Sequence, residues 1–322
     1  MSQSPLIEVK NLKKYFTQKS SLFDRKPSPV KAVDDVTFTI EEGETFGLVG
    51  ESGSGKSTIG KSLIRLHDIS EGTIKYRGID IHNKSKKEMR SLRTKMQFVF
   101  QDPFSSLNPR IRIGDALAEP LLDHGLVTKD RVRDKVKEVM EICGLPSYHI
   151  DKYPHEFSGG QRQRIGIARA MVMEPDFIVA DEPVSALDVS IQAQIINLFK
   201  ELQEKKNMTY LFISHDLSVV EHLCNKVGVL YLGSMMELTT RDKLYENPLH
   251  PYTKALLSAV PIPDPTKRRE RIVLKGDIPN PANPPKGCKF HTRCPFTEDI
   301  CLKVQPLFKE VEKGHYVACH LV

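Results

Sequence analysis

The sequence lacks the features that would embed it in a membrane or bind it to a nucleic acid. No window approaches the roughly 20 uninterrupted apolar residues of a membrane-spanning helix, and the first residues, MSQSPLIEVK, lack the apolar block of a signal peptide. The formal net charge of +6 is modest, and clusters of basic residues occur only at KSKK near residue 84 and KRRER near residue 267. These absences predict a chain that stays in the cytoplasm and binds no nucleic acid.

Cysteine is scarce over most of the chain. Six cysteines occur in 322 residues, and four of them fall in the last thirty-five. In a reducing compartment these cysteines are not expected to form a disulfide framework, so the C-terminal group suggests a metal site. Cys143 and Cys224 stand alone and are predicted to be buried packing residues.

Apolar runs alternate with helix-like segments along much of the chain. The runs rich in Val, Ile and Phe are TFGLVG, MQFVFQD, FIVADE, TYLFISHD and VGVLYLG. The segment from Val189 to Asn207 has the spacing of an amphipathic helix packed on a sheet; its apolar face consists of Ile191, Ile195, Leu198, Phe199 and Leu202. The alternation predicts an α/β fold.

Three stretches depart from this alternation. Residues 103–170 have helical periodicity without a convincing strand, which predicts a helical subdomain inserted into the α/β core. The polar run TQKSSLFDRKPSPVK predicts an exposed loop. From about Met235 the chain becomes rich in proline, which predicts a separate C-terminal extension and hence two domains, residues 1–235 and 236–322.

A phosphate-binding pattern follows the first apolar run. GESGSGKST, from Gly50 to Thr58, matches G-x-x-x-x-G-K-[ST]. The glycines let backbone N–H groups wrap phosphate oxygens, and the helix that follows presents its positive end. In such a loop Lys56 reaches the β and γ phosphates and Ser57 ligates Mg²⁺. The pattern predicts a bound nucleotide and leaves open what the nucleotide does.

Two further stretches are suited to phosphate chemistry. Asp181 and Glu182 end the run FIVADE, where one carboxylate can hold the Mg²⁺ shell and the other can orient or deprotonate an attacking water; a solvated acidic turn is the alternative. In FSGGQRQRIGIARA, residues 157–170, a serine and two glycines precede a helix whose first N–H groups suit an anion. A second phosphate-binding element in one chain suggests that it serves another chain's nucleotide.

The motifs and their order resemble those of ABC-transporter ATPases. FSGGQ resembles the signature motif of that family, Gln101 in FQDP its Q-loop, SALD its D-loop, and His215 in ISHD its switch histidine. The resemblance implies an α/β fold with a P-loop (RecA-like) ABC ATPase core. It also implies two ATPase subunits packed head to tail around two ATP molecules.

The same resemblance implies a role for each site residue. Glu182 would be the general base, His215 would sense the γ-phosphate, and Gln101 and Asp181 would lie in the Mg²⁺ and water shell. The nucleotide and its Mg²⁺ would be held by Gly50, Ser52, Gly53, Ser54, Gly55, Lys56, Ser57 and Thr58. The residues acting on the partner's nucleotide would be Ser158, Gly159, Gly160 and Gln161, with Asp188 in the D-loop. Adenine would stack on Phe16, with Tyr15 as the alternative.

Several longer stretches narrow the resemblance to one branch of the family. FQDPFSSLNPR, NPLHPYTKALLSAVP and the C-terminal cysteine region resemble the ATP-binding subunits of dipeptide and oligopeptide permeases. The resemblance covers essentially the whole chain and implies a subunit that powers peptide import at the cytoplasmic face of the membrane. It implies two transmembrane permease subunits docked near residues 103–109, an extracytoplasmic substrate-binding protein and a second, paralogous ATPase. In that branch His250, Pro251 and Tyr252 open the C-terminal extension.

The four C-terminal cysteines have the spacing C-x5-C-x6-C-x17-C; they are Cys288, Cys294, Cys301 and Cys319. Four thiolates can close a zinc site or hold a [4Fe–4S] cluster. Zinc sites commonly use two C-x2-C pairs, and the chain has none. The spacing therefore favours an iron–sulfur cluster, which members of the peptide-permease branch carry, with zinc and unligated cysteines as alternatives.

Two other functions stay open from the sequence. The same ATPase could serve nickel, oligosaccharide or glutathione import, because no residue of this chain is expected to touch the cargo. A soluble ABC ATPase of translation or DNA repair usually has two cassettes or a long coiled coil. This chain has one phosphate loop, one signature motif and no sustained heptads.

Overall fold

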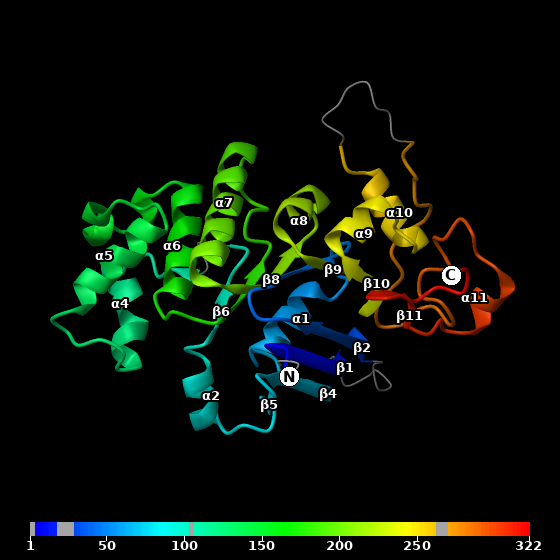
Figure 1. The fold of residues 1–322 in the computed structure, drawn as a ribbon, viewed down its shortest axis with the longest axis horizontal. Coiled ribbons are helices and arrows are strands. Elements are labelled where there is room, and N and C mark those ends of the chain that lie inside the picture. The colour runs from blue at the N-terminus through cyan, green and yellow to red at the C-terminus, as the bar shows by residue number, and fades with distance from the viewer. Residues whose placement is uncertain (1–3, 18–28, 103–105, 262–269) are drawn as a thin grey trace, which may run out of the picture. The chain divides into compact units, whose positions relative to one another are not determined.

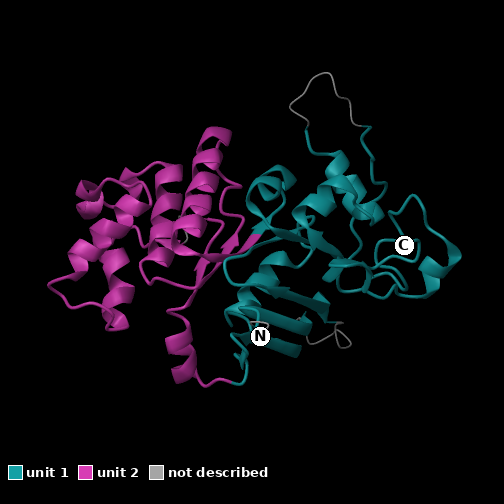
Figure 2. Cartoon of the chain, in the orientation of Figure 1, with its two compact units in different colours: residues 1–83, 213–322 teal, residues 84–212 magenta. Residues whose placement is uncertain are grey.

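The computed structural model describes residues 4–17, 29–102, 106–261 and 270–322. The chain forms two compact units (Figure 2). The first consists of residues 1–83 and 213–322, and the second of residues 84–212. The domain boundaries at residues 235 and 236 stay a prediction.

An antiparallel sheet forms the N-terminal part of the first unit, where β1, β2 and β4 lie side by side (Figure 1). Its strands, in the order β2-β1-β4-β5, are β1 (Ile7–Phe16), β2 (Val30–Ile40), β4 (Glu71–Tyr76) and β5 (Ile79–Asp80). In β2 the buried Val36, Phe38 and Ile40 alternate with more exposed residues, as expected for a strand with one face on the core. Val30 and Lys31, which were expected to lie in a loop, begin β2; residues 18–28 of that run lie outside the described part.

A second sheet of the first unit contains the strand that precedes the phosphate loop. That strand, β3, pairs in parallel with β9, and β9, β10, β12 and β11 follow one another as antiparallel neighbours. The strands are β3 (Thr45–Val49), β9 (Lys226–Tyr231), β10 (Ser234–Thr240), β11 (Lys309–Glu312) and β12 (His315–Val317). Met235, where the proline-rich extension was expected to begin, therefore lies within a strand, and the end of the chain belongs to the same sheet.

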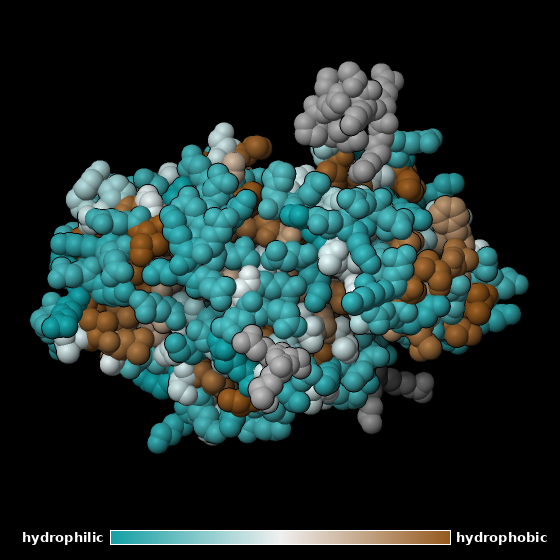
Figure 3. Space-filling view, viewed as in Figure 1, coloured by the Kyte–Doolittle hydropathy of each residue, from teal (hydrophilic) through white to brown (hydrophobic). Residues whose placement is uncertain are grey.

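The described helices of the first unit are α1 (Lys56–Leu63), α8 (Leu217–Leu223), α9 (Arg241–Glu246), α10 (Pro251–Ser258) and α11 (Asp299–Lys303). Around α11 hydrophobic surface is visible (Figure 3). The exposed apolar side chains of that stretch are Phe296, Ile300, Leu302, Val304 and Leu307.

Parallel strands form the core of the second unit. β6 (Met96–Val99) pairs with β7 (Phe177–Asp181). The strand next to β7 in strand order is β8 (Thr209–Ser214), in which the chain passes from the second unit to the first. Every residue of β7 is buried, which explains its continuous apolar sequence. The five strands predicted from apolar runs are thus confirmed as β3, β6, β7, β8 and β9.

The second unit is otherwise helical. Between β6 and β7 the described elements are α4 (Ile113–Asp123), α5 (Val132–Ile142), the short 3-10 helices η1 (Ser147–Asp151) and η2 (Pro154–Glu156), and α6 (Gly159–Met171). α2 (Lys86–Leu92) precedes β6, and α7 (Val189–Lys206) follows β7. Among the described residues, no helix is both long and apolar enough to cross a membrane.

Helix α7 agrees with its predicted amphipathic pattern. Ile195, Leu198, Phe199 and Leu202 are buried, whereas Ile191, nearer the start of the helix, is only partly covered. The helix ends at Lys206 and is capped by Asn207, whose φ of 51° is left-handed, a conformation that asparagine tolerates better than most residues. The predicted burial of Cys143 and Cys224 is confirmed, with exposed fractions of 0% and 1%.

Candidate functional site

The phosphate loop connects β3 to α1 in the first unit. Three of its glycines have positive φ: Gly50 at 147°, Gly53 at 77° and Gly55 at 104°. A Cβ on Gly50 would lie 2.2 Å from the carbonyl oxygen of Leu230, so a side chain is excluded there by contact as well as by conformation. The loop is therefore shaped by backbone geometry that only glycine provides.

Lys56 lies inside this loop. Its side chain is buried, and its ammonium donates to the carbonyl oxygens of Gly50 at 2.8 Å and Glu51 at 3.0 Å. Helix α1 begins at Lys56 without an acidic residue in its first turn. The loop thus combines a fixed cation with the positive end of a helix, which suits a polyphosphate.

Phe16 and Tyr15 differ in how accessible their rings are. Phe16 is 37% exposed, its ring meets that of His67 edge to face, and the Lys14 ammonium lies 4.8 Å from its centroid. Tyr15 is partly buried, and its hydroxyl donates to Asp34 at 2.5 Å. Burial and the Asp34 carboxylate raise the pKa of Tyr15. Of the two rings, Phe16 is the one with an open surface for stacking on a base.

The second unit brings two of the predicted catalytic side chains, Gln101 and Glu182, together. Gln101 donates through Nε2 to Glu182 at 3.1 Å and to Ser185 at 3.4 Å. Asp181 is buried at the end of β7. Glu182 has a φ of 47°, which a residue with a side chain seldom adopts and which is retained mainly where function requires it. Q-loop, carboxylate and D-loop thus meet in one place.

At the start of α6 (Gly159–Met171), the N–H group of Gln161 is not open to an anion, contrary to the prediction. Ser158 is the N-cap: its hydroxyl accepts from the N–H of Gln161 at 3.3 Å, and the Gln161 side chain accepts from the N–H of Ser158 at 3.0 Å. This reciprocal cap already occupies the N–H of Gln161. Gly159 is exposed at the helix start, whereas Gly160 is buried.

Asp188 caps the next helix, accepting from the N–H of Ile191 at 3.0 Å at the start of α7. A small cavity of about 70 Å³ in the second unit is lined by Gln101 and Gly159 and by D-loop residues including Leu187. Q-loop, signature motif and D-loop therefore face a common space. His215 is exposed after β8, in the first unit with the phosphate loop.

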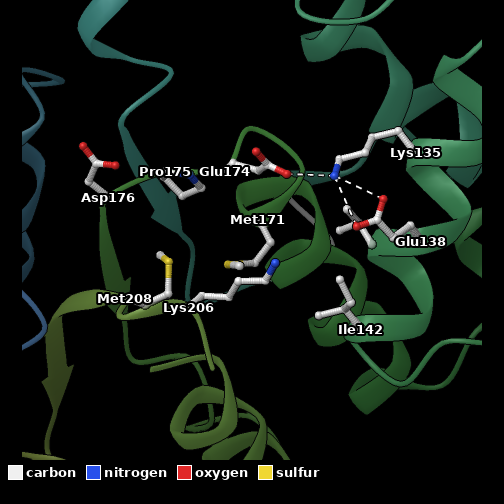
Figure 4. Close-up of a pocket in the computed structure, with 10 residues that line it drawn as sticks. Lys135, Glu138, Ile142, Met171, Glu174, Pro175, Asp176, Lys206 and Met208 are labelled. Carbon is white, nitrogen blue, oxygen red and sulfur yellow. Dashed lines mark hydrogen bonds and ion pairs between the residues drawn. The ribbon is translucent and has the colours of Figure 1, made fainter. Parts of the chain in front are cut away.

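A larger cavity in the second unit, about 240 Å³, is lined by no predicted site residue (Figure 4). On its rim Lys135 is paired with Glu174 at 2.7 Å and with Glu138 at 3.2 Å. These pairs raise the pKa of Lys135 and lower that of Glu174. Its lining also includes apolar residues such as Ile142, Met171 and Met208.

The four C-terminal cysteines lie close enough to influence one another electrostatically. The pKa of Cys288 is raised to about 11, chiefly by burial and in smaller part by the thiols of Cys301, Cys319 and Cys294. Nevertheless, within the described residues no group of three or more His, Cys, Asp or Glu side chains could hold a metal ion. The arrangement seen here therefore does not form the predicted ligand set for an iron–sulfur cluster or zinc.

Solved structures identify the class of this fold. A dimeric ATP-binding cassette, MJ0796, superposes with a TM-score of 0.65 at 28% identity, covering 73% of this chain and 98% of that one. Another structure of the same cassette, with the same score, is a post-hydrolysis dimer bound to ADP and Pi. The cbiO1 protein of Clostridium perfringens, part of an ABC transporter complex, also has a TM-score of 0.65, at 25% identity over 76% of this chain and 91% of its own.

Sequence comparisons narrow the class to a branch. The ABC transporter family model matches residues 33–185, and the model of the oligopeptide/dipeptide transporter C-terminal region matches residues 236–301. The oligopeptide transport ATP-binding protein AppF of Bacillus subtilis is 57% identical, covering 99% of this chain and 98% of the relative. OppF of Salmonella typhimurium is 49% identical over 98% of this chain and 95% of its own. The chain belongs to the ABC transporter family, among its oligopeptide-type ATP-binding proteins.

Proposed function

We propose that this chain is the ATP-hydrolysing subunit that powers import of di- or oligopeptides across the cytoplasmic membrane. The observation that carries the proposal is that one chain matches both the ABC transporter model and the oligopeptide/dipeptide C-terminal model. The relatives with which it aligns end to end are named as oligopeptide transport proteins. Nickel, oligosaccharide and glutathione are not proposed as cargo, and neither is a role in translation or DNA repair.

Hydrolysis at this site requires positioning and charge neutralisation more than covalent chemistry. Lys56 and the glycine-rich loop would neutralise and hold the phosphates. Glu182, already bonded to Gln101 at 3.1 Å, would orient or deprotonate the attacking water. Hydroxyl, amide and carboxylate oxygens from Ser57, Gln101 and Asp181 are the hard donors that Mg²⁺ prefers, and Mg²⁺ would supply further neutralisation of the phosphate charge.

The partners follow from the same proposal. A second, paralogous ATPase would place its phosphate loop against Ser158, Gly159, Gly160 and Gln161, and two transmembrane permease subunits and an extracytoplasmic binding protein would complete the transporter. The chain would then lie at the cytoplasmic face of the membrane. Of the residues proposed to dock on the permease, 103–105 lie outside the described part, Leu107 is buried, and Asn108 and Pro109 are exposed. The exposed pair is the better candidate for that contact.

The iron–sulfur cluster stays a prediction from the cysteine spacing. The mutual influence of the four thiols supports it, whereas the described arrangement is not a ligand set. Iron and acid-labile sulfide in anaerobically purified protein would measure it. The prediction is about four irons per chain; a colourless protein with one zinc, or with no metal, would overturn it.

The substitution Glu182→Gln tests the catalytic assignment. Removing a general base should lower the ATP hydrolysis rate by about 10²–10⁴-fold, while ATP binding is retained because the phosphate loop is untouched. Hydrolysis and binding would be measured on the assembled transporter. Glu201→Gln is the matched control, since Glu201 is exposed on α7 and pairs with Lys205 one turn further along the same helix. An unchanged rate for Glu182→Gln would contradict the assignment.

A further inference from the structure

The second residue of the phosphate loop, Glu51, is held by the C-terminal part of the first unit. Arg293 donates two hydrogen bonds to the Glu51 carboxylate, Nη1 to Oε2 at 2.5 Å and Nη2 to Oε1 at 3.0 Å. The hydroxyl of Tyr252 accepts from the backbone N–H of Glu51 at 2.9 Å. Two residues more than 200 positions away in the sequence therefore fix both the side chain and the backbone of one loop residue.

This ion pair is shielded from solvent. The Arg293 side chain is 8% exposed and that of Glu51 is 25% exposed. The guanidinium lies 5.9 Å from the centre of the Tyr231 ring, and that ring packs against Tyr252 and Phe290 at centroid distances of 4.8 and 5.3 Å. Because Arg293 is largely buried and lies over a ring that is itself held by two others, it has little room to swing away from Glu51.

Glu51 also contacts Lys56, the cation of the phosphate loop. The carbonyl oxygen of Glu51 accepts from the Lys56 ammonium at 3.0 Å. The position of Glu51 thus affects the group proposed to meet the β and γ phosphates. A carboxylate without a partner in this loop would also repel a triphosphate, and the bidentate pair with Arg293 neutralises that charge.

We infer that Arg293 and Tyr252 are positioning residues of the phosphate loop, which neutralise and orient Glu51 so that a nucleoside triphosphate can bind beside Lys56. The C-terminal region, in this view, is a structural part of the ATP site. The inference rests on the proposed function, since it requires that the loop binds ATP.

A second contact anchors the same region to the N-terminal sheet. The ammonium of Lys289, which is 5% exposed, donates to Asp34 at 3.0 Å, to Ser234 at 2.7 Å and to the carbonyl oxygen of Leu232 at 3.0 Å. Asp34 also accepts from Tyr15, the neighbour of Phe16. Because Lys289 holds the segment independently, loss of the Arg293 contact should leave the fold intact and expose its effect on ATP binding.

The test is ATP binding by the full-length chain with Mg²⁺, measured by calorimetry. Arg293→Gln should raise the ATP dissociation constant about tenfold, the size expected when a shielded carboxylate loses its partner. Glu51→Gln with Arg293→Gln should restore binding to within about twofold of the unaltered chain, because the unpaired charge is then gone. In ATP hydrolysis the single variant should raise KM and leave kcat nearly unchanged.

Arg77→Gln is the matched control. Arg77 also binds a carboxylate with two hydrogen bonds, to Glu42 at 3.1 and 2.7 Å, but both side chains are more than 40% exposed. Its substitution should leave ATP binding unchanged. If Arg293→Gln bound ATP like the unaltered chain, or if the double variant bound as weakly as the single one, the inference would be overturned.

Two further variants, Tyr252→Phe and Lys56→Ala, allow the inference to be tested independently of Arg293→Gln. Tyr252→Phe keeps the packed ring and loses the acceptor for the Glu51 N–H, so it should weaken ATP binding a few-fold. This variant tests the inference even if Arg293→Gln does not fold, and unchanged ATP binding would count against it. Lys56→Ala distinguishes a failure of the proposed function from a failure of the positioning role. If Lys56→Ala binds ATP normally, the proposed function fails; if it loses ATP binding while Arg293→Gln does not, only the positioning role fails.

Discussion

His250 is a residue whose titration should be visible in the stability of the chain. Its side chain is 1% exposed, and its Nδ1 accepts the N–H of Tyr252 at 3.0 Å, which caps helix α10. Burial lowers the pKa of His250 to about 3. An unfolded histidine titrates near pH 6.5, so the unfolded chain binds more protons than the folded chain between these values. The stability that neutral His250 provides is complete above pH 6.5 and is lost as the pH falls.

We predict that the free energy of unfolding falls by about 2 kcal/mol between pH 7 and pH 5 because of this residue. Urea denaturation at a series of pH values would measure it. His250→Asn keeps a side-chain acceptor for the helix cap and removes the titration, so its profile should be flatter. An equally steep profile in this variant would show that other groups cause the pH dependence.

At the residue scale the sequence predicts roles, and the structure adds contacts that no local pattern indicates. Lys56 and Glu182 are chosen because phosphate chemistry needs a cation and a carboxylate, and Gln101 is chosen from the resemblance to the family's Q-loop; their roles stay predictions. The choice of Phe16 over Tyr15 rested on spacing, and the structure gives its physical basis in the exposure of Phe16 and the Asp34 bond of Tyr15. The Arg293–Glu51 pair was not predicted, since its partners are 242 positions apart and no local pattern joins them.

Helix α6 shows how one glycine sets the spacing of two elements in the second unit. A Cβ built on Gly160 would lie 2.4 Å from Cγ2 of Ile191 in α7. That methyl group is attached to a β-branched carbon and has little freedom to move. The glycine of the signature motif therefore allows α6 to begin close to the start of α7, where Asp188 forms the cap.

Gly160→Ala should lower the free energy of unfolding by about 1–3 kcal/mol, the usual cost of overpacking, and should also slow ATP hydrolysis. Gly166→Ala is the matched control in the same helix, because a Cβ at Gly166 would meet nothing within 4 Å and φ is not positive there. That substitution should instead raise stability by about 0.5–1 kcal/mol. Thermal or urea unfolding of both variants measures the difference, and shifts in the same direction would contradict the packing argument.

At the element scale continuous apolar strands were predictable and the antiparallel sheet was not. β3, β7 and β8 are buried along their whole length, so their sequences are apolar runs. β1 and β2 bury only part of their residues and carry Lys, Asp and Thr on the other positions. The short runs of alternation in β1 and β2 do not distinguish a half-buried strand from a polar loop. β10 was missed because the prolines that follow it dominated the composition.

For the whole molecule, the predicted ATP-site residues are shared between the two compact units. The phosphate loop, Phe16 and His215 belong to the first unit, and Gln101, Asp181, Glu182 and the signature motif belong to the second. The ABC family and its oligopeptide branch could be predicted from the sequence because the motif order and the C-terminal stretches are specific to them. The composition of the partner set stays a prediction from the resemblance, since the surfaces of those partners are encoded in other chains.

The central claim is that ATP hydrolysis by this chain powers peptide uptake. It is tested most directly by uptake of a labelled oligopeptide in cells whose only copy of this subunit carries Glu182→Gln, with labelled nickel uptake followed in the same cells. The account predicts that peptide uptake is lost while nickel uptake continues as in cells with the unaltered chain. Continued peptide uptake together with loss of nickel uptake would contradict it.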